Sequence, residues 1–231
     1  RGENISSSKK NRMGIFSYEI GIETGEYNTS ETLIIDPVLT WATFCAGSNG
    51  YEGINSIDCD ANNNVYVGIY TVSSNFPTQA WAGAYNQAAF GGIMDAAILR
   101  FTSAGVLTWA TYYGGSGDDG AMSIACDGAN NIYVTVIATS GFPTLAWAGA
   151  FNDATFGGGA YDAFVLRFTS AGVLTWSTYY GGTGDDRAHS IVCDGANNIY
   201  VTGMTDAGFP TVAWAGAYND ATAGGGGAYD A

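Results

Sequence analysis

Two Gly-Asp-Asp turns carry the most closely spaced carboxylates of the sequence. Their acidic residues are Asp118, Asp119, Asp185 and Asp186, and the corresponding stretch at 48–52 is altered to Ser-Asn-Gly-Tyr-Glu. Paired carboxylates beside glycine-rich backbone could bind Ca²⁺, which takes six to eight oxygen ligands. The same residues are suited to solvated Asx turns. Because no EF-hand or RTX-like spacing accompanies them, we favour the turn interpretation and keep Ca²⁺ as the alternative.

A recurring aromatic loop offers a second kind of site, a surface for a ligand or a partner. The sequence AWAGAYN stands at 80–86 and 213–219, with AWAGAFN at 146–152. Aromatic faces suit the C–H surfaces of sugars and protein partners alike. The rings could instead fold back over the edge of their own repeat and its neighbour, and we favour that structural role. The residues concerned are Trp81, Tyr85, Trp147, Phe151, Trp214 and Tyr218.

Nucleophilic and metal chemistry have little support in the residue pattern. His189 is the only histidine, and the other copies hold Met122 and Asn55 at that position, so we predict no catalytic residue. Cysteines recur at one position without the neighbouring His or Cys that a metal site needs. We predict that they are small, buried core residues on an inner strand, beyond disulfide reach of one another. They are Cys59, Cys126 and Cys193, and Cys45 has no obvious partner.

Two arginines at equivalent positions, Arg100 and Arg167, are predicted to be structural. A half-buried guanidinium needs a hydrogen-bond acceptor. We therefore expect each to meet a carboxylate of its own unit, such as Asp95 or Asp162.

An internal repeat must position all of these residues. FTSAGVLTW occurs at 101–109 and again at 168–176, and the Ser-Ile-x-Cys-Asp stretch recurs every 67 residues at 56–60, 123–127 and 190–194. Each unit predicts four short strands, because two hairpin turns rich in Gly, Asn and Ser separate segments of β-branched and aromatic residues. Many strand positions are apolar on both faces, which is typical of sheets stacked on one another. The sequence thus predicts an all-β fold of four-stranded antiparallel blades, as in a β-propeller.

The linked motifs LTWSTYYGGTGDDRAHSIVCDGANNIYVTGMT, GFPT, GAY and DAFVLRF resemble the bacterial "seven-bladed β-propeller" (SBBP) repeat over roughly 39–231. The resemblance implies a propeller fold and a secreted or cell-surface protein, often from Bacteroidota. It implies no chemistry, because the biochemical role of that family is mostly undefined. In such proteins a β-rich domain commonly precedes the repeats.

Composition excludes several partners. Residues 13–231 hold three basic and twenty acidic side chains, within a chain of net charge −14. Such a surface repels the phosphates of nucleic acids and anionic membrane surfaces. No run of eighteen apolar residues occurs, so we expect no membrane insertion.

The repeat divides the chain into expected segments. Residues 1–12 predict a flexible basic arm and residues 13–38 the end of a preceding β domain, with strands at 14–22 and 32–35. The propeller repeats occupy 39–231. They comprise a partial blade at 39–47 with a fourth strand at Leu39–Phe44, blades at about 54–114 and 121–181, and a partial blade at 188–231.

Too few blades are present to close a ring, since propellers typically have four to eight. We therefore expect a fragment of a longer repeat protein, or self-association by strand addition with 14–22 and 32–35 as the donors. We predict a non-enzymatic, extracellular or cell-surface module for adhesion, scaffolding or fibre assembly, whose partner is a protein or a glycan. The alternatives are a hydrolase or lyase that uses a propeller channel, and a lectin-like glycan-binding propeller.

Overall fold

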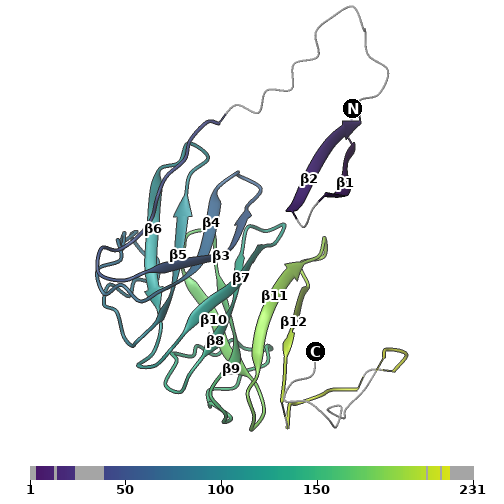
Figure 1. Cartoon of the computed structure of the whole chain (residues 1–231). Helices are drawn as coiled ribbons and strands as arrows, with labels where there is room; N and C mark the ends of the chain where they lie inside the picture. The colour runs from purple at the N-terminus through teal and green to yellow at the C-terminus, as the bar shows by residue number, and fades with distance from the viewer. Residues whose placement is uncertain (1–3, 13–14, 24–38, 207, 214, 219–231) are drawn as a thin grey trace, which may run out of the picture. The chain divides into compact units, whose positions relative to one another are not determined.

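The computed structural model describes residues 4–12, 15–23, 39–206, 208–213 and 215–218, and its regular structure is entirely β-strand (Figure 1). Among these residues there is no helix that could cross a membrane. The strands are β1 (Asn4–Arg12), β2 (Ile15–Glu23), β3 (Glu52–Cys59), β4 (Val65–Thr71), β5 (Asp95–Phe101), β6 (Leu107–Tyr113), β7 (Gly120–Cys126), β8 (Ile132–Ala138), β9 (Asp162–Phe168), β10 (Leu174–Tyr180), β11 (Arg187–Cys193) and β12 (Ile199–Met204). The predicted all-β class is confirmed.

The chain forms two compact units, Arg1–Leu39 and Thr40–Ala231. In the first unit, β1 pairs with β2 as an antiparallel hairpin. Asn4–Arg12 are therefore a strand, and not the flexible arm that the sequence predicted, because their backbone pairs along its whole length with 15–23. The expected strand at 32–35 lies outside the described residues.

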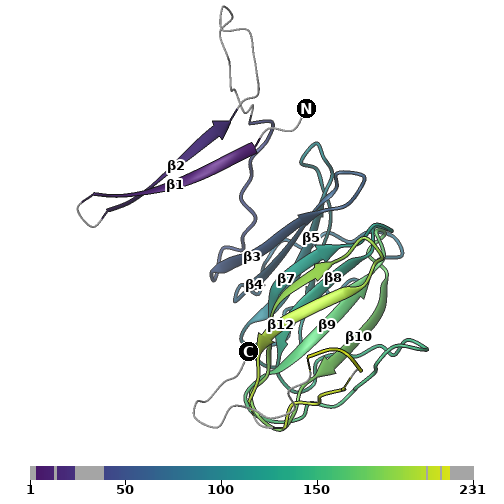
Figure 2. The ribbon, with the colours of Figure 1, turned by 90° about the vertical axis from the view of Figure 1, so that its right-hand side faces the viewer.

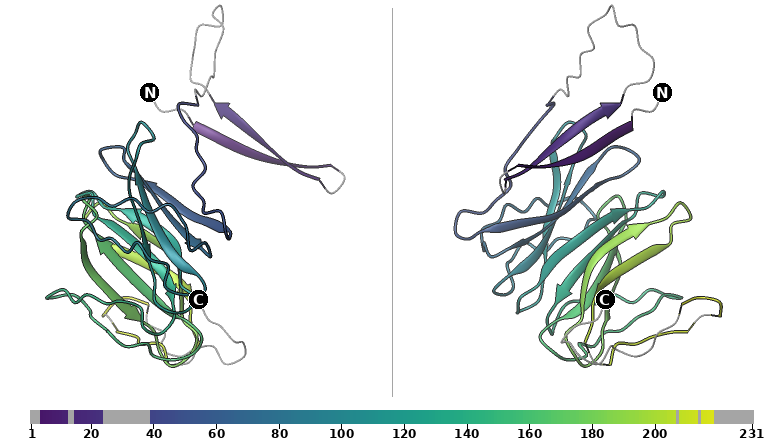
Figure 3. Two further views of the ribbon diagram at one scale, coloured as in Figure 1. Left: turned by 90° about the vertical axis from the view of Figure 1, so that its left-hand side faces the viewer. Right: turned by 45° about the vertical axis from the view of Figure 1, so that its right-hand side comes forward.

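The second unit contains three antiparallel sheets that follow one another along the chain. Sheet 1 is β3–β6 and sheet 2 is β7–β10, each with its strands hydrogen-bonded in sequence order, and sheet 3 is the pair β11–β12. These sheets are the two predicted blades and the beginning of a third. Figures 2 and 3 show them stacked side by side, without a closed ring among the described residues.

The stacking buries a mixed aliphatic and aromatic layer between sheets 1 and 2. We call the side of a sheet that meets the following sheet its trailing face, and the side that meets the preceding sheet its leading face. Tyr66, Ile98 and Trp109 of the trailing face of sheet 1 form one cluster with Phe164 and Leu166 of the leading face of sheet 2. Apolar residues on both faces of the strands of sheet 2 are thus explained, since sheet 1 covers one side of it and sheet 3 covers the other.

The segment at 40–47 covers part of the leading face of sheet 1, but it is not the strand that the sequence predicted. No strand is formed at Leu39–Phe44, because the segment has no ladder partner among the described residues. Its Trp41 side chain nevertheless packs where the equivalent tryptophan of a blade does, whereas Phe44 is fully exposed although its equivalent Tyr112 is buried. The Trp41 ring lies 5.7 Å from Phe101, as the equivalent Trp109 lies 5.3 Å from Phe168.

The innermost strands β3, β7 and β11 are also linked by hydrogen bonds that recur from one junction to the next. The Ile124 amide donates to Ser56 Oγ at 3.1 Å, and the Ile191 amide donates to Ser123 Oγ at 3.2 Å. These two contacts join sheets 1 and 2 and sheets 2 and 3 with the same chemistry.

A second recurring link runs between the hairpin turns of neighbouring sheets. The Ala61 amide donates to Asn130 Oδ1 at 2.9 Å, and the Gly128 amide donates to Asn197 Oδ1 at 3.0 Å. Both asparagines have a positive φ of 62° and 65°, which asparagine tolerates better than most residues. Asparagine therefore forms the hairpin turn of its own sheet and also accepts a hydrogen bond from the hairpin turn of the preceding sheet.

Candidate functional site

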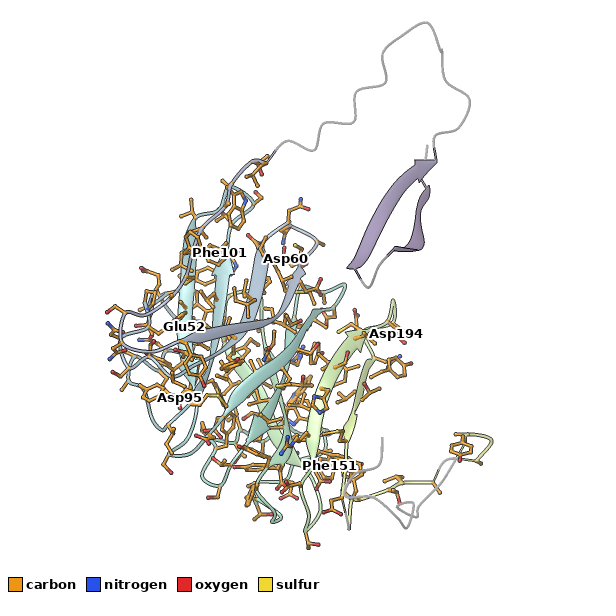
Figure 4. The ribbon with its side chains drawn as sticks, in the orientation of Figure 1. Glu52, Asp60, Asp95, Phe101, Phe151 and Asp194 are labelled. Carbon is orange, nitrogen blue, oxygen red and sulfur yellow. The ribbon has the colours of Figure 1, made fainter. Side chains whose placement is uncertain are left out.

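The acidic turns lie at one end of the sheets. In Figure 4, Glu52 and Asp95 mark this end, and Asp60 and Asp194 mark the opposite, hairpin end. The aromatic loops run along the outer strands β6 and β10, where Gln79 pairs with Ala110 and Leu145 with Ser177, so the candidate residues form two separate arrangements.

In the first copy of the aromatic loop, the rings fold back onto the sheets. Trp81 stacks over the Arg100 guanidinium, which lies 4.7 Å from the centre of the ring. The Tyr85 amide donates to the Gly172 carbonyl of sheet 2 at 2.8 Å, and its ring lies 4.9 Å from that of Tyr113. In this copy the loop packs against its own sheet and the next one.

In the second copy, the same loop is more open. Trp147 stacks over Arg167 at 4.4 Å, but it is 45% exposed, and Phe151 is 52% exposed. The reason is that sheet 3 has two strands among the described residues, so no equivalent of Gly172 covers this loop. Tyr218 is 93% exposed in the third copy, and Trp214 lies outside the described residues.

The arginines do not meet the carboxylates that the sequence predicted. Arg100 Nε donates to Tyr66 Oη at 3.1 Å and its Nη1 donates to Thr108 Oγ1 at 2.7 Å. Arg167 repeats this arrangement with Tyr133 and Thr175. The expectation of contacts with Asp95 and Asp162 was wrong because a hydroxyl pair and a tryptophan face already satisfy each guanidinium.

The second carboxylate of each acidic turn links two parts of the junction. Asp119 Oδ2 accepts from the Gly115 amide at 2.7 Å, and its Oδ1 accepts from the amide of Thr139 at 2.7 Å and from its hydroxyl at 2.9 Å. Asp186 accepts from the Gly182 amide and the Thr205 hydroxyl, and from the amide of Asp206 at 3.3 Å. Glu52 replaces the aspartate in the first copy, where it accepts from the Gly47 amide and the Thr71 hydroxyl, each at 3.0 Å. The oxygens that a cation would need are thus occupied by N–H and O–H donors.

The first carboxylates of these turns differ from each other. Asp185 accepts from the Ala160 amide and forms an ion pair with Arg187 at 3.6 Å. Asp118 Oδ1 is buried without a hydrogen bond. Within the described residues, no group of three or more His, Cys, Asp or Glu side chains is arranged to hold a metal ion.

A second pair of buried carboxylates was not anticipated from the sequence as a feature of the junction. Asp95 and Asp162 are fully buried, and their Oδ2 atoms accept from the Gly91 and Gly157 amides at 2.7 and 2.6 Å. Their Oδ1 atoms have no hydrogen bond. Burial, to which the nearby Asp119 and Asp186 respectively add, raises each pKa to about 6.

The glycines of the Tyr-Tyr-Gly-Gly motif give a signal that could have located this pair. A Cβ at Gly181 would lie 2.7 Å from Asp162 Oδ1, and one at Gly114 would meet Asp95 in the same way. The first glycine is therefore required by the buried aspartate of its own sheet. The amide of the second glycine, Gly115 or Gly182, binds the aspartate of the next sheet.

One comparison with known proteins identifies the repeat. Residues 175–210 match the family model of SBBP, described as a beta-propeller repeat. This part of the chain is an SBBP repeat. It runs from β10 through the second acidic turn to the end of β12 and beyond, and the 67-residue period places the equivalent sequence at 108–143. No curated protein matches the chain.

The cysteines of the three sheets are more exposed than predicted. Cys59 is exposed and Cys126 and Cys193 are half-buried, because each ends the innermost strand of its sheet and sits at the rim of the stack. All four cysteines are free thiols. Burial, with nearby carboxylates adding, raises the pKa of Cys193 to about 11, so this thiol is protonated at neutral pH and is a poor nucleophile.

His189 lies on β11, where its side chain is exposed. The equivalent residue in sheet 1, Asn55, donates through Nδ2 to the Ala121 carbonyl at 2.8 Å and so joins sheets 1 and 2. The equivalent residue in sheet 2, Met122, has no N–H or O–H group in its side chain and cannot repeat this hydrogen bond.

Proposed function

We propose that this chain is a non-enzymatic repeat module that acts outside the cell or at its surface, in adhesion, scaffolding or fibre assembly. The observation that carries the proposal is that both blade junctions use the same Ser–Ile and Asn–amide hydrogen bonds. Polar groups that could do chemistry are used to join blades. Near-identical blades suit a protein that stacks repeat units and presents the same surface on each of them.

A hydrolase or lyase is the less favoured interpretation. An active site needs a nucleophile or base within hydrogen-bond reach of a partner that orients it. His189 is the only histidine of the sequence, and its equivalents Asn55 and Met122 are chemically unlike it. The buried aspartates accept from backbone amides of their own junctions.

A glycan or a protein ligand at the second aromatic loop is a further candidate, favoured by one observation. Trp147 presents a half-exposed ring stacked on the Arg167 guanidinium, and Phe151 of the same loop presents a second exposed ring beside Tyr180. Flat apolar faces next to a cation fit an acidic sugar or an aromatic peptide side chain. This surface would serve adhesion.

Binding arrays test the proposal directly. We expect the chain to bind members of a glycan or peptide array and to turn over none of a panel of chromogenic hydrolase and lyase substrates. Trp147→Ala and Phe151→Ala should reduce array binding at least tenfold, whereas Tyr51→Ala should not. Tyr51 is a matched control because it is also a largely exposed aromatic residue, 61% accessible, far from this loop in the sequence. Turnover that disappears in His189→Ala would refute the proposal.

A further inference from the structure

We infer that Asn49 is a site of spontaneous covalent modification, where the chain deamidates without an enzyme and thereby loosens the bend before β3. Asn49 is followed by Gly50, and both residues are exposed in that bend. Asparagine is one of the thermolabile residues of proteins. Glycine has no Cβ to restrict its backbone, so its amide nitrogen reaches the side chain of the preceding residue easily. The inference concerns the chemistry of the chain itself and goes beyond the proposed function.

The reaction is an intramolecular substitution at the Asn49 side-chain amide. The Gly50 nitrogen attacks Asn49 Cγ and forms a C–N bond, the bond from Cγ to Nδ2 breaks, and the Gly50 amide proton leaves with Nδ2 as ammonia. The product is a cyclic imide, which water then opens at one of its two carbonyl carbons. Water attack at Cγ leaves an aspartate, whereas water attack at the main-chain carbon leaves an isoaspartate, in which the main chain runs through Cβ and Cγ. Water is the one co-reactant.

The reacting groups are available in the folded protein. Within the described residues, the Gly50 amide donates no hydrogen bond and Asn49 Oδ1 accepts none. The Asn49 side chain has one hydrogen bond, in which Nδ2 donates to Ser74 Oγ at 2.8 Å, and this contact is exposed. A hydrogen bond of this kind contributes about 0.5–1.5 kcal/mol, so thermal motion often releases the side chain.

Asp-Gly pairs form the same imide with loss of water instead of ammonia, but the turns of this protein hold them. At the hairpin end of sheet 2, Asp127 accepts from the amides of Ala129 and Asn131 at 2.9 and 2.8 Å. The Gly128 amide donates to Asn197 Oδ1 at 3.0 Å. Both reacting groups are therefore engaged. The Asp-Gly pairs of the sequence are Asp119-Gly120, Asp127-Gly128 and Asp194-Gly195.

The other two Asp-Gly pairs are held in similar ways. Asp119 is fully buried and both of its oxygens accept hydrogen bonds, and Asp194 accepts from the Asn198 amide at 2.8 Å. Asn-Gly itself occurs once in the sequence. The residues equivalent to Asn49 in the next two repeats are Ser116 and Thr183, whose side chains have no carbonyl carbon to attack. The modification is therefore confined to the first repeat.

The bend that contains Asn49 is tied to the turn after β4, so the modification has a structural consequence. The Ser48 amide donates to Asn75 Oδ1 at 3.0 Å, and Asn75 Nδ2 donates to Ser48 Oγ at 2.7 Å. The bend also packs closely, since a Cβ at Gly50 would lie 2.7 Å from Ser73 Oγ. An isoaspartate adds a carbon to the main chain between Ser48 and Gly50, and the bend has no space for it with these contacts in place. Formation of the isoaspartate therefore releases the bend.

Peptide mapping by mass spectrometry tests the inference on the full chain, incubated folded and, in parallel, unfolded in urea at the same mildly alkaline pH. The ratio of the unfolded to the folded rate at one site cancels the intrinsic difference between asparagine and aspartate. We expect a ratio within about threefold of one at Asn49 and of about tenfold or more at Asp127, because a held site reacts only during local opening. Asn49→Ser introduces the residue found at the equivalent Ser116, and this control should remove the mass change at residue 49.

Hydrogen exchange tests the structural consequence. The Ser48 amide should exchange about tenfold faster or more in the isoaspartate product, whereas the Asn130 amide in the hairpin turn of sheet 2 should not change. An Asn49 that stays intact in the folded chain while the unfolded chain reacts would overturn the inference, as would equal exchange at Ser48 before and after the reaction. Neither result bears on binding to the arrays, so the proposed function is tested separately.

Discussion

Replacing Asp95 by asparagine is expected to stabilise the protein at neutral pH, although most core substitutions destabilise. The Asp95 side chain is fully buried, its Oδ1 has no hydrogen bond, and the carboxylate of Asp119 lies close enough to add to the effect of burial. Burial raises the pKa of both Tyr85 and Tyr112, and the charge of Asp95 adds to each increase. Asparagine keeps the shape and the acceptor for the Gly91 amide but removes the buried charge.

The size of the effect follows from the pKa. A folded-state pKa of about 6, against 3.8 for the ordinary group, corresponds to about 3 kcal/mol at about 1.4 kcal/mol per tenfold change in acidity. The folded state binds the proton more tightly, so this stability is fully present below about pH 4 and is lost as the pH rises through about 6. The Asp95→Asn variant avoids that loss. After the desolvation of the new amide we expect a gain of about 1–2 kcal/mol at pH 7.5, which shrinks by about 1 kcal/mol at pH 5.

Asp119→Asn makes the same chemical change, and burial raises the pKa of Asp119 too, but we expect the opposite sign because the hydrogen bonds that this variant loses outweigh the relief of the buried charge. Both Asp119 oxygens accept from amides, those of Gly115 and Thr139. An amide side chain has one acceptor oxygen, so its NH₂ group would face an N–H donor and leave it unpaired, at a cost of about 1–3 kcal/mol. Removal of one negative charge is common to both variants and cancels in the comparison.

Urea unfolding followed by tryptophan fluorescence, at pH 5 and pH 7.5, measures both variants against the parent. Asp162→Asn and Asp186→Asn repeat the pair at the next junction and should repeat the signs. If Asp95→Asn loses stability at pH 7.5, or if Asp95→Asn and Asp119→Asn shift stability in the same direction, the assignment of Asp95 Oδ1 as an unpaired buried oxygen is wrong.

Three further predictions concern the turns. Gly172→Ala should lower the free energy of unfolding by more than Gly149→Ala. Both glycines have a positive φ, so each alanine costs about 1 kcal/mol of backbone strain, but a Cβ at Gly172 would also lie 3.2 Å from the Trp109 ring, whereas a Cβ at Gly149 meets nothing. Thermal melts of the two variants measure the difference. Asn130→Ala should cost about 1–2 kcal/mol, since it loses the cap on the Ala61 amide and a residue suited to positive φ, and Asn130→Gly should recover the second part in urea titrations. EDTA and added Ca²⁺ should leave the Tm unchanged, because N–H and O–H donors already contact both carboxylate oxygens of Asp119 and of Asp186; a Ca²⁺-dependent rise of several degrees would reopen the metal-site interpretation.

The sequence predicted the sheets well because each copy of the repeat can be checked against the other copies. Strand positions and hairpins recur at 67 residues, so β3–β6 and β7–β10 could be placed from the Ser-Ile-x-Cys-Asp and FTSAGVLTW motifs. Periodicity reports which residues are equivalent. It does not report which of them are covered, and so Trp81 and Trp147, predicted alike, differ in exposure.

The partners of polar side chains were harder to predict than the strands. Arg100 was assigned to Asp95 from chemistry and nearness in sequence, but the cross-strand register brings Tyr66 and Thr108 to it instead. The role of Asp119 depends on amides of Gly115 and Thr139 that converge through the turn between β6 and β7. Such contacts arise from three-dimensional register, which the residue pattern alone leaves open.

Because the junctions between blades use the same contacts, a whole blade can be gained or lost without changing the contacts between the remaining blades. Because Ser56 and Ser123 contact Ile124 and Ile191 in the same way, excising 67 residues from one copy of a motif to the next would bring Ser56 to Ile191 with no new side chain. Recombination between near-identical gene segments could therefore lengthen or shorten the array in steps of one blade. Each product would keep the contacts that hold its neighbours together, so the number of blades can change faster than the sequence of any one of them.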